Sequence, residues 1–481
     1  MDTPGGAFVR TEVAGLRTLH LPAGGSTRLT LHVGVGWADE TFSTRGVTHA
    51  IEHLVMGAAE PGRFETNACV TAFQTAFWAN GPAARVGAFL GRVTAALRDL
   101  PTERLGREER VLAAETLGHT YGPHEVLLQS RFGNEGPGLG MFPGIGSRAL
   151  APDVVAEHHA RWFVADNAVL TVVGPLPDGL DAALPPGPPP ERAFHGWHAG
   201  PAWDHCDVTD PCLSLEAPDV PAASLALRAM AARLERTLRH DRGVVYGVQP
   251  DIVRLPGTGR VVLQVSTQAL PEVAHEVAEV MVAELRHRAS VGVSDAEVAE
   301  DLEWFEALEA DPDNRASHVQ VQAERLLAGV PAVQLAEARA AVAGTRPGDV
   351  ADIVRAALPT AMVLVPRGCG PLTDLPLVPT CGARLELSTR RLRRRLRARV
   401  PSGAVLGFAD GVVQYRDEDG DVHEVRFDEC VGVGVGQGGG RLLLGRRGCF
   451  VWVDPREFRG ARAVVRAIDE RVPAGLQFPL T

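Results

Sequence analysis

The chain has 481 residues, of which 45% are hydrophobic and 22% charged, and its net charge is −11 at pH 7. This composition is typical of a globular protein with about three domains. The negative charge argues against a general affinity for nucleic acid. All 48 basic side chains counted as Lys or Arg are arginine, which excludes Schiff-base chemistry on a lysine and phosphate binding through a Walker lysine.

Seven cysteines are spread from Cys69 to Cys449, and none belongs to a C-x-x-C pair. An odd number without such pairs argues against a disulfide scaffold and against a zinc finger built on cysteines. The N-terminal residues lack the basic and apolar regions of a signal peptide. No apolar run reaches the roughly 18 residues that a membrane span needs. We therefore expect a cytoplasmic protein.

The first block, residues 1–183, opens with strands and continues with helices. Apolar and polar residues alternate over 7–36, as in half-buried strands. The sequence then predicts a helix from about Gly46, three later helices and a closing strand, over 84–99, 103–117, 151–163 and 168–174. The proline-rich segment 184–195 is predicted to be a stiff linker, because it fits neither a helix interior nor a central strand.

The second block, residues 196–368, repeats the order of strands followed by helices. We predict strands at 212–218, 244–253, 259–267 and 361–365, and helices at 222–240, 271–289, 294–309 and 314–328. The two blocks are therefore predicted to be weakly similar halves of class α+β, each closing on a strand.

A second linker, 369–384, leads to the third block, 385–481. Short strands with Asp-Gly and Gly-Gly turn signals precede one helix at about 457–470. This predicts a small, mostly antiparallel β domain with a C-terminal helix, which weakly resembles bacterial pleckstrin-homology-like domains. The basic run Arg390–Arg399 could contact a membrane, but beside an acidic protein body a solvated strand or linker is the better interpretation.

His49, Glu52 and His53 form an H-x-x-E-H string on the helix predicted from Gly46. Residues four apart share a helix face, so both imidazoles can reach one metal ion. The neighbouring carboxylate can accept a proton without being a ligand. Two histidines make an incomplete site, since a catalytic zinc ion has three protein ligands and an open position. The string alone leaves a metal site and ordinary histidines equally open.

Four segments, in order, resemble the insulinase or pitrilysin family of zinc metallopeptidases, which carry this inverted form of H-E-x-x-H. They are GWADETFSTRGVTHAIEHLVMGA (36–58), NACVTAFQTAFW (67–78), REERVLAAETLG (107–118) and FVADNAVLTVVGPL (163–176). The resemblance covers about residues 7–375. It implies two homologous sheet-plus-helices halves of the insulinase-like metallopeptidase fold.

By this resemblance the chain is a zinc-dependent endopeptidase or oligopeptidase with one Zn²⁺, whose ligands are His49, His53 and Glu115. Glu52 is implied as the general base. Glu108 lies two helical turns before Glu115 on the same face, and is implied as a group that supports the ligands. The alternative for Glu108 is a solvated helix carboxylate.

Asn67 and Ala68 lie in the segment that resembles the family's substrate-binding strand, to which an extended peptide adds as a further strand. The chain departs from the family between His53 and Glu115, where the gap of 62 residues is short by about four helical turns. The missing segment corresponds to a helix between the helix of His49 and His53 and the strand of Asn67. Its loss leaves the shape of the substrate cleft open.

Residues 238–248, LRHDRGVVYGV, resemble a segment of the family's second domain. The resemblance implies that Arg239 and Tyr246 stabilise the oxyanion formed in amide hydrolysis, reaching across the clamshell to the zinc site of a facing domain. The alternative is a cation at a helix C-terminus and an ordinary strand tyrosine.

Two halves amount to half of the family's four-domain chamber, so the resemblance implies a homodimer or a heterodimer with a related subunit. A homodimer would be self-sufficient, because the chain has both the zinc motif and the Arg–Tyr pair. A second hypothesis is a catalytically silent subunit that binds peptides or serves assembly. This second hypothesis is based on the shortened segment 54–66 and the added third block.

Overall fold

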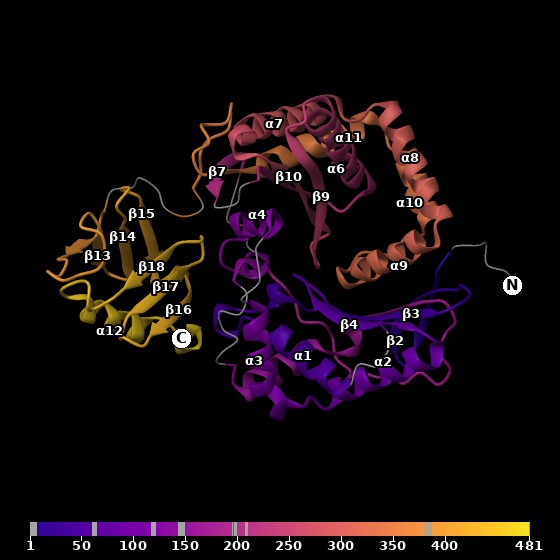
Figure 1. Ribbon diagram of the computed structural model, residues 1–481, viewed down its shortest axis with the longest axis horizontal. Helices are drawn as coiled ribbons and strands as arrows, with labels where there is room; N and C mark the ends of the chain where they lie inside the picture. The colour runs from indigo at the N-terminus through magenta and orange to yellow at the C-terminus, as the bar shows by residue number, and fades with distance from the viewer. Residues whose placement is uncertain are drawn as a thin grey trace.

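The computed structural model describes residues 7–59, 65–116, 122–142, 150–194, 196, 200–206, 210–379, 381 and 387–480. Its first half is built on a six-stranded sheet of order β1-β2-β6-β3-β5-β4 (Figure 1). The strands are β1 (Val9–Val13), β2 (Leu16–Leu21), β3 (Thr27–Val33), β4 (Glu65–Val70), β5 (Thr75–Gly81) and β6 (Ala168–Val173). Neighbours are antiparallel except β2 and β6. Strand β4 therefore forms one edge.

One face of this sheet carries the helices of the first half. They are α1 (Val47–Ala59), α2 (Ala83–Arg98), α3 (Leu105–Thr116) and α5 (Pro152–Trp162). Leu29, Leu31 and Val33 of β3 alternate toward these helices and share a buried core with Ile51 and Phe89. Burying these side chains is the main stabilising term for the layer, at about 2 kcal/mol for each large apolar side chain.

The second half repeats the plan on a five-stranded sheet of order β7-β11-β8-β10-β9. The strands are β7 (Ala202–Cys206), β8 (Cys212–Pro218), β9 (Val245–Leu255), β10 (Arg260–Ala269) and β11 (Met362–Pro366). The helices are α6 (Pro221–Leu234), α7 (Ala274–Val291), α8 (Asp295–Ala310), α9 (Pro312–Leu327), α10 (Leu335–Ala343) and α11 (Pro347–Ala357). Only β7 and β11 run parallel to each other.

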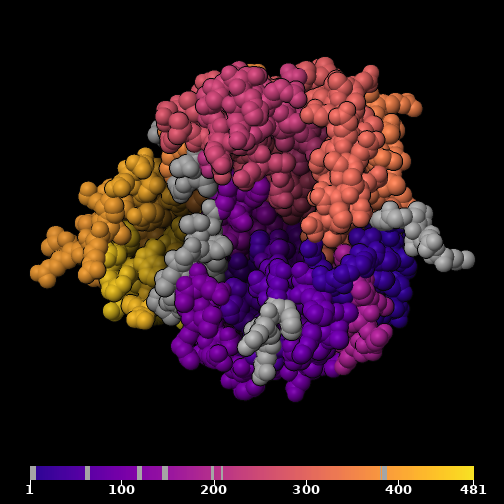
Figure 2. Space-filling view, turned by 45° about the vertical axis from the view of Figure 1, so that its right-hand side comes forward, coloured from indigo at the N-terminus to yellow at the C-terminus, as the bar shows by residue number. Residues whose placement is uncertain are grey.

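Each half places one helix on the other half's sheet. Helix α9 packs on the first sheet, where Val319 and Ala323 contact Leu19 and Val169 on the face opposite α1. Figure 2 shows the orange surface of the segment that includes α9 against the indigo surface of the first half. Helix α4 (Pro123–Phe132) of the first half covers the second sheet in the same way. Both faces of each central strand are thus buried, which explains their near-continuous apolar sequences.

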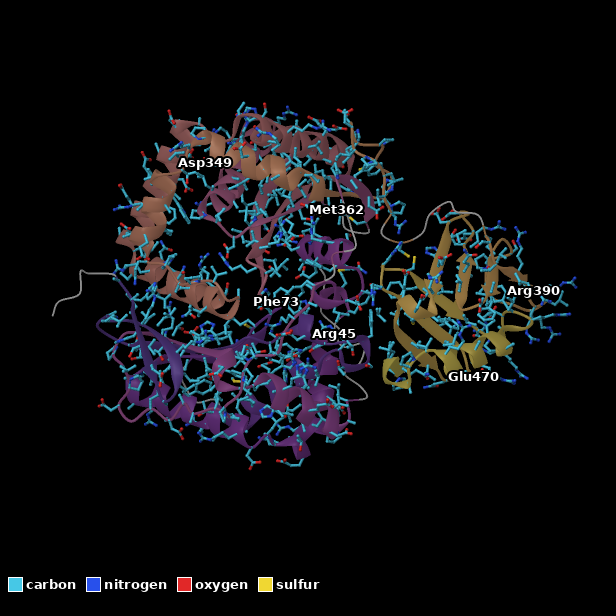
Figure 3. The ribbon with its side chains drawn as sticks, turned by 180° about the vertical axis from the view of Figure 1, so that it is seen from behind. Arg45, Phe73, Asp349, Met362, Arg390 and Glu470 are labelled. Carbon is cyan, nitrogen blue, oxygen red and sulfur yellow. The ribbon has the colours of Figure 1, made fainter. Side chains whose placement is uncertain are left out.

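A cavity of about 360 Å³ lies between the halves. Phe73, in the turn between β4 and β5, lies at this boundary (Figure 3) and packs against the same apolar cluster as Val253 of β9. Asp251 of β9 approaches His124 of α4, with 3.8 Å between Oδ2 and Nδ1. The halves are therefore already closed on each other within one chain.

The third part has two four-stranded sheets and one helix. The first, of order β12-β13-β14-β15, has strands β12 (Arg390–Leu392), β13 (Val405–Ala409), β14 (Val412–Arg416) and β15 (Val422–Arg426). The second, of order β18-β17-β16-β19, has strands β16 (Cys430–Gly436), β17 (Arg441–Gly445), β18 (Phe450–Val453) and β19 (Gln477–Leu480). Helix α12 (Ala461–Arg471) shares their core. Within the basic run, Arg394 donates to the carbonyl oxygens of Ala398 and Val400, so part of that run is structural.

The predicted α+β class is confirmed, and the differences are local. Helices α4 and α11 were not predicted, although each begins with a proline in its first turn, the usual place for that residue in a helix. Helix α10 and strands β7 and β19 were also missed. The helix predicted at 222–240 is straight only as far as Leu234 and continues as a π-helical turn, η7 (Glu235–Asp241). No helix in the described part of the chain is long and apolar enough to cross a membrane.

Candidate metal centre and active site

The helix that carries the histidines is fixed at its start by Glu40. This buried carboxylate accepts hydrogen bonds from the backbone N–H groups of Gly46 and Thr48, at 2.8 and 2.9 Å. These N–H groups lack partners within the helix, and a negative charge there is favoured by the helix dipole. The guanidinium of Arg45 donates to the same carboxylate at 2.8 Å. The start of α1 is therefore anchored by a buried, fully paired charge.

Gly36 brings the loop before α1 against the turn that follows β4. A Cβ at this position would lie 2.0 Å from the carbonyl oxygen of Thr71, so only glycine allows the approach. The neighbouring N–H groups of Trp37 and Ala38 then donate to the carbonyl oxygens of Thr71 and Ala72, at 3.2 and 2.9 Å. This contact ties the start of α1 to the edge of the sheet.

His49, His53 and Glu115 come together at one point. The Nε2 atoms of His49 and His53 lie 3.6 and 3.4 Å from the same oxygen, Oε2 of Glu115. The two rings are 4.8 Å apart between centroids and nearly perpendicular. The side chains of His49 and Glu115 are 42% and 50% exposed, so the point opens to solvent.

These separations suit a single zinc ion. Ligand atoms about 2.0–2.2 Å from a tetrahedral ion lie about 3.4 Å from one another, which is close to the spacing of the three groups. Two imidazoles and one carboxylate are the donor set of catalytic zinc sites, which keep one position open. The residues present therefore fit a zinc ion without rearrangement of their side chains.

Glu52 lies beside this point and is largely buried. Its Oε2 atom is 3.5 Å from Nε2 of His49 and 3.8 Å from Nε2 of His53. Burial, and then the charge of Glu115, raise the pKa of Glu52 to about 8. A cation at the point between the ligands would oppose both effects.

Glu108 faces the other side of His53. Its Oε2 atom lies 3.7 Å from Nδ1 of that ring, and the side chain is buried. A carboxylate in this position orients the imidazole so that Nε2 presents its lone pair to a metal. Gly57 on α1 lies beside this carboxylate: a Cβ there would be 3.4 Å from Oε1 of Glu108, an ordinary van der Waals contact. Arg104 then donates to the carbonyl oxygen of Gly57 at 2.7 Å.

Asn67 and Ala68 lie on β4, which is the edge of the first sheet. Helix α1 contacts this strand. The side chain of Asn67 accepts a hydrogen bond from the N–H of Ala68 at 2.9 Å. Of the shortened segment, residues 60–64 lie outside the described residues.

Arg239 and Tyr246 meet each other but belong to a different part of the molecule. The guanidinium of Arg239 lies 5.6 Å from the ring centroid of Tyr246, within the range of a cation–π contact. Arg239 also donates to Glu235 at 2.7 Å, and Glu235 accepts from the N–H of Val248 at 2.8 Å. The ring of Tyr246 is 77% exposed, so the pair is assembled on the surface of the second half.

Strand β9 separates this pair from the first half. Tyr246 is near the start of β9, whereas Val253 and Leu255, near its end, belong to an apolar cluster with Phe73 and residues of α4. Nine residues of strand span about 30 Å. The structure thus brings His49, Glu52, His53 and Glu115 together with Glu108. It leaves Tyr246 near the opposite end of β9, with Arg239 of η7 beside it.

Sequence reasoning missed Glu40 and Gly36, which position helix α1. The signal for Glu40 was available, because an acidic residue shortly before a helix is a common partner of its first N–H groups. The contact of Gly36 with Thr71 joins distant segments and has no local signal.

The sequence matches no family model and no curated protein. Among solved structures, the peptidase M16 inactive domain from Pseudomonas fluorescens is 15% identical, with a TM-score of 0.60 over 76% of this chain and 99% of that one. The first half of the protease PqqL from Escherichia coli is 17% identical, with a TM-score of 0.56 over 74% and 92%. Pitrilysin is 14% identical, with a TM-score of 0.57, and the match covers 74% of this chain but 44% of pitrilysin.

The comparison corrects one expectation. The predicted cytoplasmic location is wrong, because PqqL is described as a periplasmic protease. The cysteine count and N-terminal composition on which that prediction was based do not decide the compartment. What the comparison shows directly is architecture: about three quarters of the chain has the fold of M16 peptidase domains, in the arrangement that forms half of pitrilysin.

Proposed function

We propose that the chain is a zinc-dependent peptidase that hydrolyses extended peptides at the centre formed by His49, His53 and Glu115. The observation that carries the proposal is the approach of both imidazole Nε2 atoms to one oxygen of Glu115, at 3.6 and 3.4 Å, beside the buried carboxylate of Glu52. A zinc ion held there would polarise the scissile carbonyl and acidify the attacking water.

Glu52 then acts as the proton carrier. The Oε2 atom of its carboxylate lies 3.5 and 3.8 Å from the Nε2 atoms of His49 and His53. It accepts a proton from the attacking water and delivers it to the leaving amine. Glu108 keeps His53 in the ligating orientation.

The free edge of β4 supports binding of an extended peptide through backbone hydrogen bonds. Asn67 and Ala68 lie on this edge, next to α1. Binding of this kind depends little on side chains, so we propose weak sequence selectivity and peptide or unfolded protein segments as substrates.

We further propose that the active form is a dimer in which Arg239 and Tyr246 of one chain face the zinc centre of another. Two observations support this. The pair lies about 30 Å along β9 from the contact with its own first half, and it is exposed. In the facing chain, a cation and a phenol hydroxyl could stabilise the oxyanion. The division into 1–183, 196–368 and 385–481 is proposed as the domain structure of each subunit.

The decisive experiment compares Glu52→Gln with the wild type on a library of unstructured peptides. We expect cleavage to fall by about 10²–10⁴-fold, because a general base is lost, while zinc content stays unchanged. Glu12→Gln, on the opposite edge strand, is the matched control and should retain activity. Unchanged cleavage by metal-purified Glu52→Gln protein would contradict the mechanism. Peptide capture without cleavage by the wild type would instead favour a silent binding subunit.

A further inference from the structure

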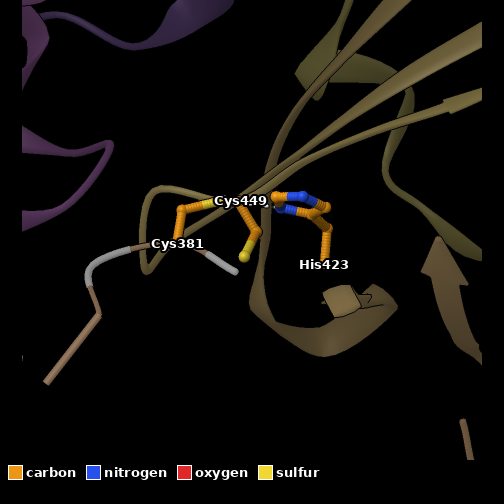
Figure 4. A group of neighbouring side chains, drawn as sticks. All are labelled: Cys381, His423 and Cys449. Carbon is orange, nitrogen blue, oxygen red and sulfur yellow. Dashed lines mark hydrogen bonds between the residues drawn. The ribbon is translucent and has the colours of Figure 1, made fainter. Parts of the chain in front are cut away.

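A second cluster of metal-binding side chains lies far from the proposed peptidase centre. Cys381, His423 and Cys449 place one sulfur or nitrogen atom each within 4.8 Å of the others (Figure 4). Cys381 precedes the third part, His423 is on β15, and Cys449 is in the turn between β17 and β18. The sequence separates them by 26 residues or more, so the fold alone brings them together.

The donor atoms are oriented toward one another. The Sγ atom of Cys381 lies 3.2 Å from Nδ1 of His423. On the far side of the ring, Nε2 of His423 lies 3.2 Å from Oδ2 of Asp417. A proton on Nε2 donated to this carboxylate leaves the lone pair of Nδ1 facing the sulfur atoms. This carboxylate–histidine arrangement is the one that accompanies metal-ligating histidines.

Asp417 is itself held in place by the turn between β14 and β15. Its Oδ1 atom accepts the N–H of Asp421 at 2.9 Å, and its own N–H donates to the carbonyl of Asp421 at 3.0 Å. The acidic turn 417–421 therefore has a specific task, which is to aim one carboxylate at His423. All three candidate ligands are partly buried, so solvent water has only limited access to compete with them for a metal ion.

We propose that Cys381, His423 and Cys449 bind a second zinc ion, distinct from the one at the peptidase centre. Two sulfurs and one imidazole are a soft donor set, which favours Zn²⁺ over Mg²⁺ or Ca²⁺. Ligand atoms of a tetrahedral Zn²⁺ site with sulfur and nitrogen donors lie about 3.5–3.8 Å apart, which the cluster reaches with small side-chain movements. The three residues would leave one position of a tetrahedral ion open.

The location gives this ion a structural task. Just before Cys381, the chain pairs with the second sheet, where the N–H of Val378 donates to the carbonyl of Trp203 at 3.0 Å. On the other side, the turn that holds Cys449 docks on the first half, where Asn134 Nδ2 donates to the carbonyl of Gly445 at 2.9 Å. A zinc ion there ties the incoming linker to the β domain and fixes the domain beside both halves.

The test measures zinc in full-length protein purified under reducing conditions without chelator. The double variant His49→Ala/His53→Ala removes the peptidase centre, so any remaining zinc belongs to the second cluster. We expect this protein to retain about one zinc per chain. Adding Cys449→Ser or Cys381→Ser should abolish it, whereas Cys69→Ser, an exposed cysteine on β4, should not.

Two further readouts distinguish a metal site from a disulfide or from side chains that are merely close together. Replacement of zinc by Co²⁺ should give a thiolate-to-cobalt absorption band that Cys449→Ser weakens, and Asp417→Asn should lower zinc affinity by about 10–100-fold. Thermal unfolding of each variant shows whether it is folded, so that loss of zinc is not confused with loss of the fold. Zinc content independent of both cysteines would overturn the proposal. So would an intact mass showing that Cys381 and Cys449 form a disulfide in the protein purified under reducing conditions.

Discussion

Glu52 in the first half is buried and Glu297 in the second half is partly buried, and their carboxyl groups have contrasting surroundings. In the first half, burial and then the charge of Glu115 raise the pKa of Glu52 to about 8. In the second half, burial also raises the pKa of Glu297, but hydrogen bonds from Arg288 and Ser294 outweigh it and lower the pKa to about 2. The pKa values of these two glutamates differ because Glu297 has an arginine partner, whereas Glu52 lies beside two histidines and a second acid.

The comparison separates two uses of charge. Arg288 is buried and donates to Glu284 at 2.6 Å and to Glu297 at 2.5 Å, so this network is complete within the chain. The cluster around Glu52 is not balanced in this way, and a divalent cation would stabilise it. An acidic cluster without balancing cations indicates a ligand-binding site, whereas acidic groups paired with an arginine indicate a structural role.

The largest expected effect is loss of the third ligand. Glu115→Ala removes the oxygen shared by His49 and His53, so zinc affinity should fall by more than the 10–100-fold seen when a supporting group is lost. Cleavage should fall with zinc occupancy. Equilibrium dialysis gives the affinity, and Glu109→Ala on the same helix is the control. Equal zinc binding by Glu115→Ala and wild type would refute this assignment.

The next effect tests whether the second half serves a facing chain. Tyr246→Phe should lower kcat by about 10²–10³-fold with zinc content unchanged, because an oxyanion donor is lost. Tyr415→Phe, on β14, is the matched control.

Mixing two inactive variants tests directly whether the Arg–Tyr pair of one chain serves the zinc centre of another chain. Tyr246→Phe mixed with His49→Ala/His53→Ala should recover about a quarter of wild-type activity, since half of the random dimers contain one intact centre out of two. No recovery in a mixture that exchanges subunits would mean that the pair acts within its own chain or not at all.

A smaller effect is expected at Glu108, whose carboxylate faces Nδ1 of His53. Glu108→Gln keeps the size of the side chain but weakens its hold on the imidazole, so zinc affinity should fall by about 10–100-fold. Saturating zinc should restore most of the cleavage, which a role as ligand or base would not allow. Glu103→Gln provides the control.

Only part of the proposed zinc centre is local in the sequence. His49 and His53 are one helical turn apart, and the position of Glu115 follows from the family resemblance. The second cluster could not be predicted in this way, since only the fold brings Cys381 of the linker close to His423 on β15 and Cys449 after β17. Helix α4 is hard to predict for another reason: its consecutive residues Val126, Leu127 and Leu128 are all buried, so its sequence lacks the apolar spacing of a helix with one buried face.

The smallest expected effect tests the paired network. Because the folded-state pKa of Glu297 lies below the usual value of about 4.5, its ionised form stabilises the protein above that pH, and the contribution disappears as the pH falls toward 2. Glu297 is partly exposed to solvent, which screens the interaction, so Glu297→Gln should cost about 1 kcal/mol of unfolding free energy at pH 7. The difference between variant and wild type in urea unfolding should shrink steadily below pH 4. Glu300→Gln, on the same helix but in an exposed pair with Arg236, should change stability by a few tenths of a kcal/mol at most. A loss for Glu297→Gln that stays constant down to pH 2 would mean that packing of the side chain, rather than its charge, stabilises the start of α8.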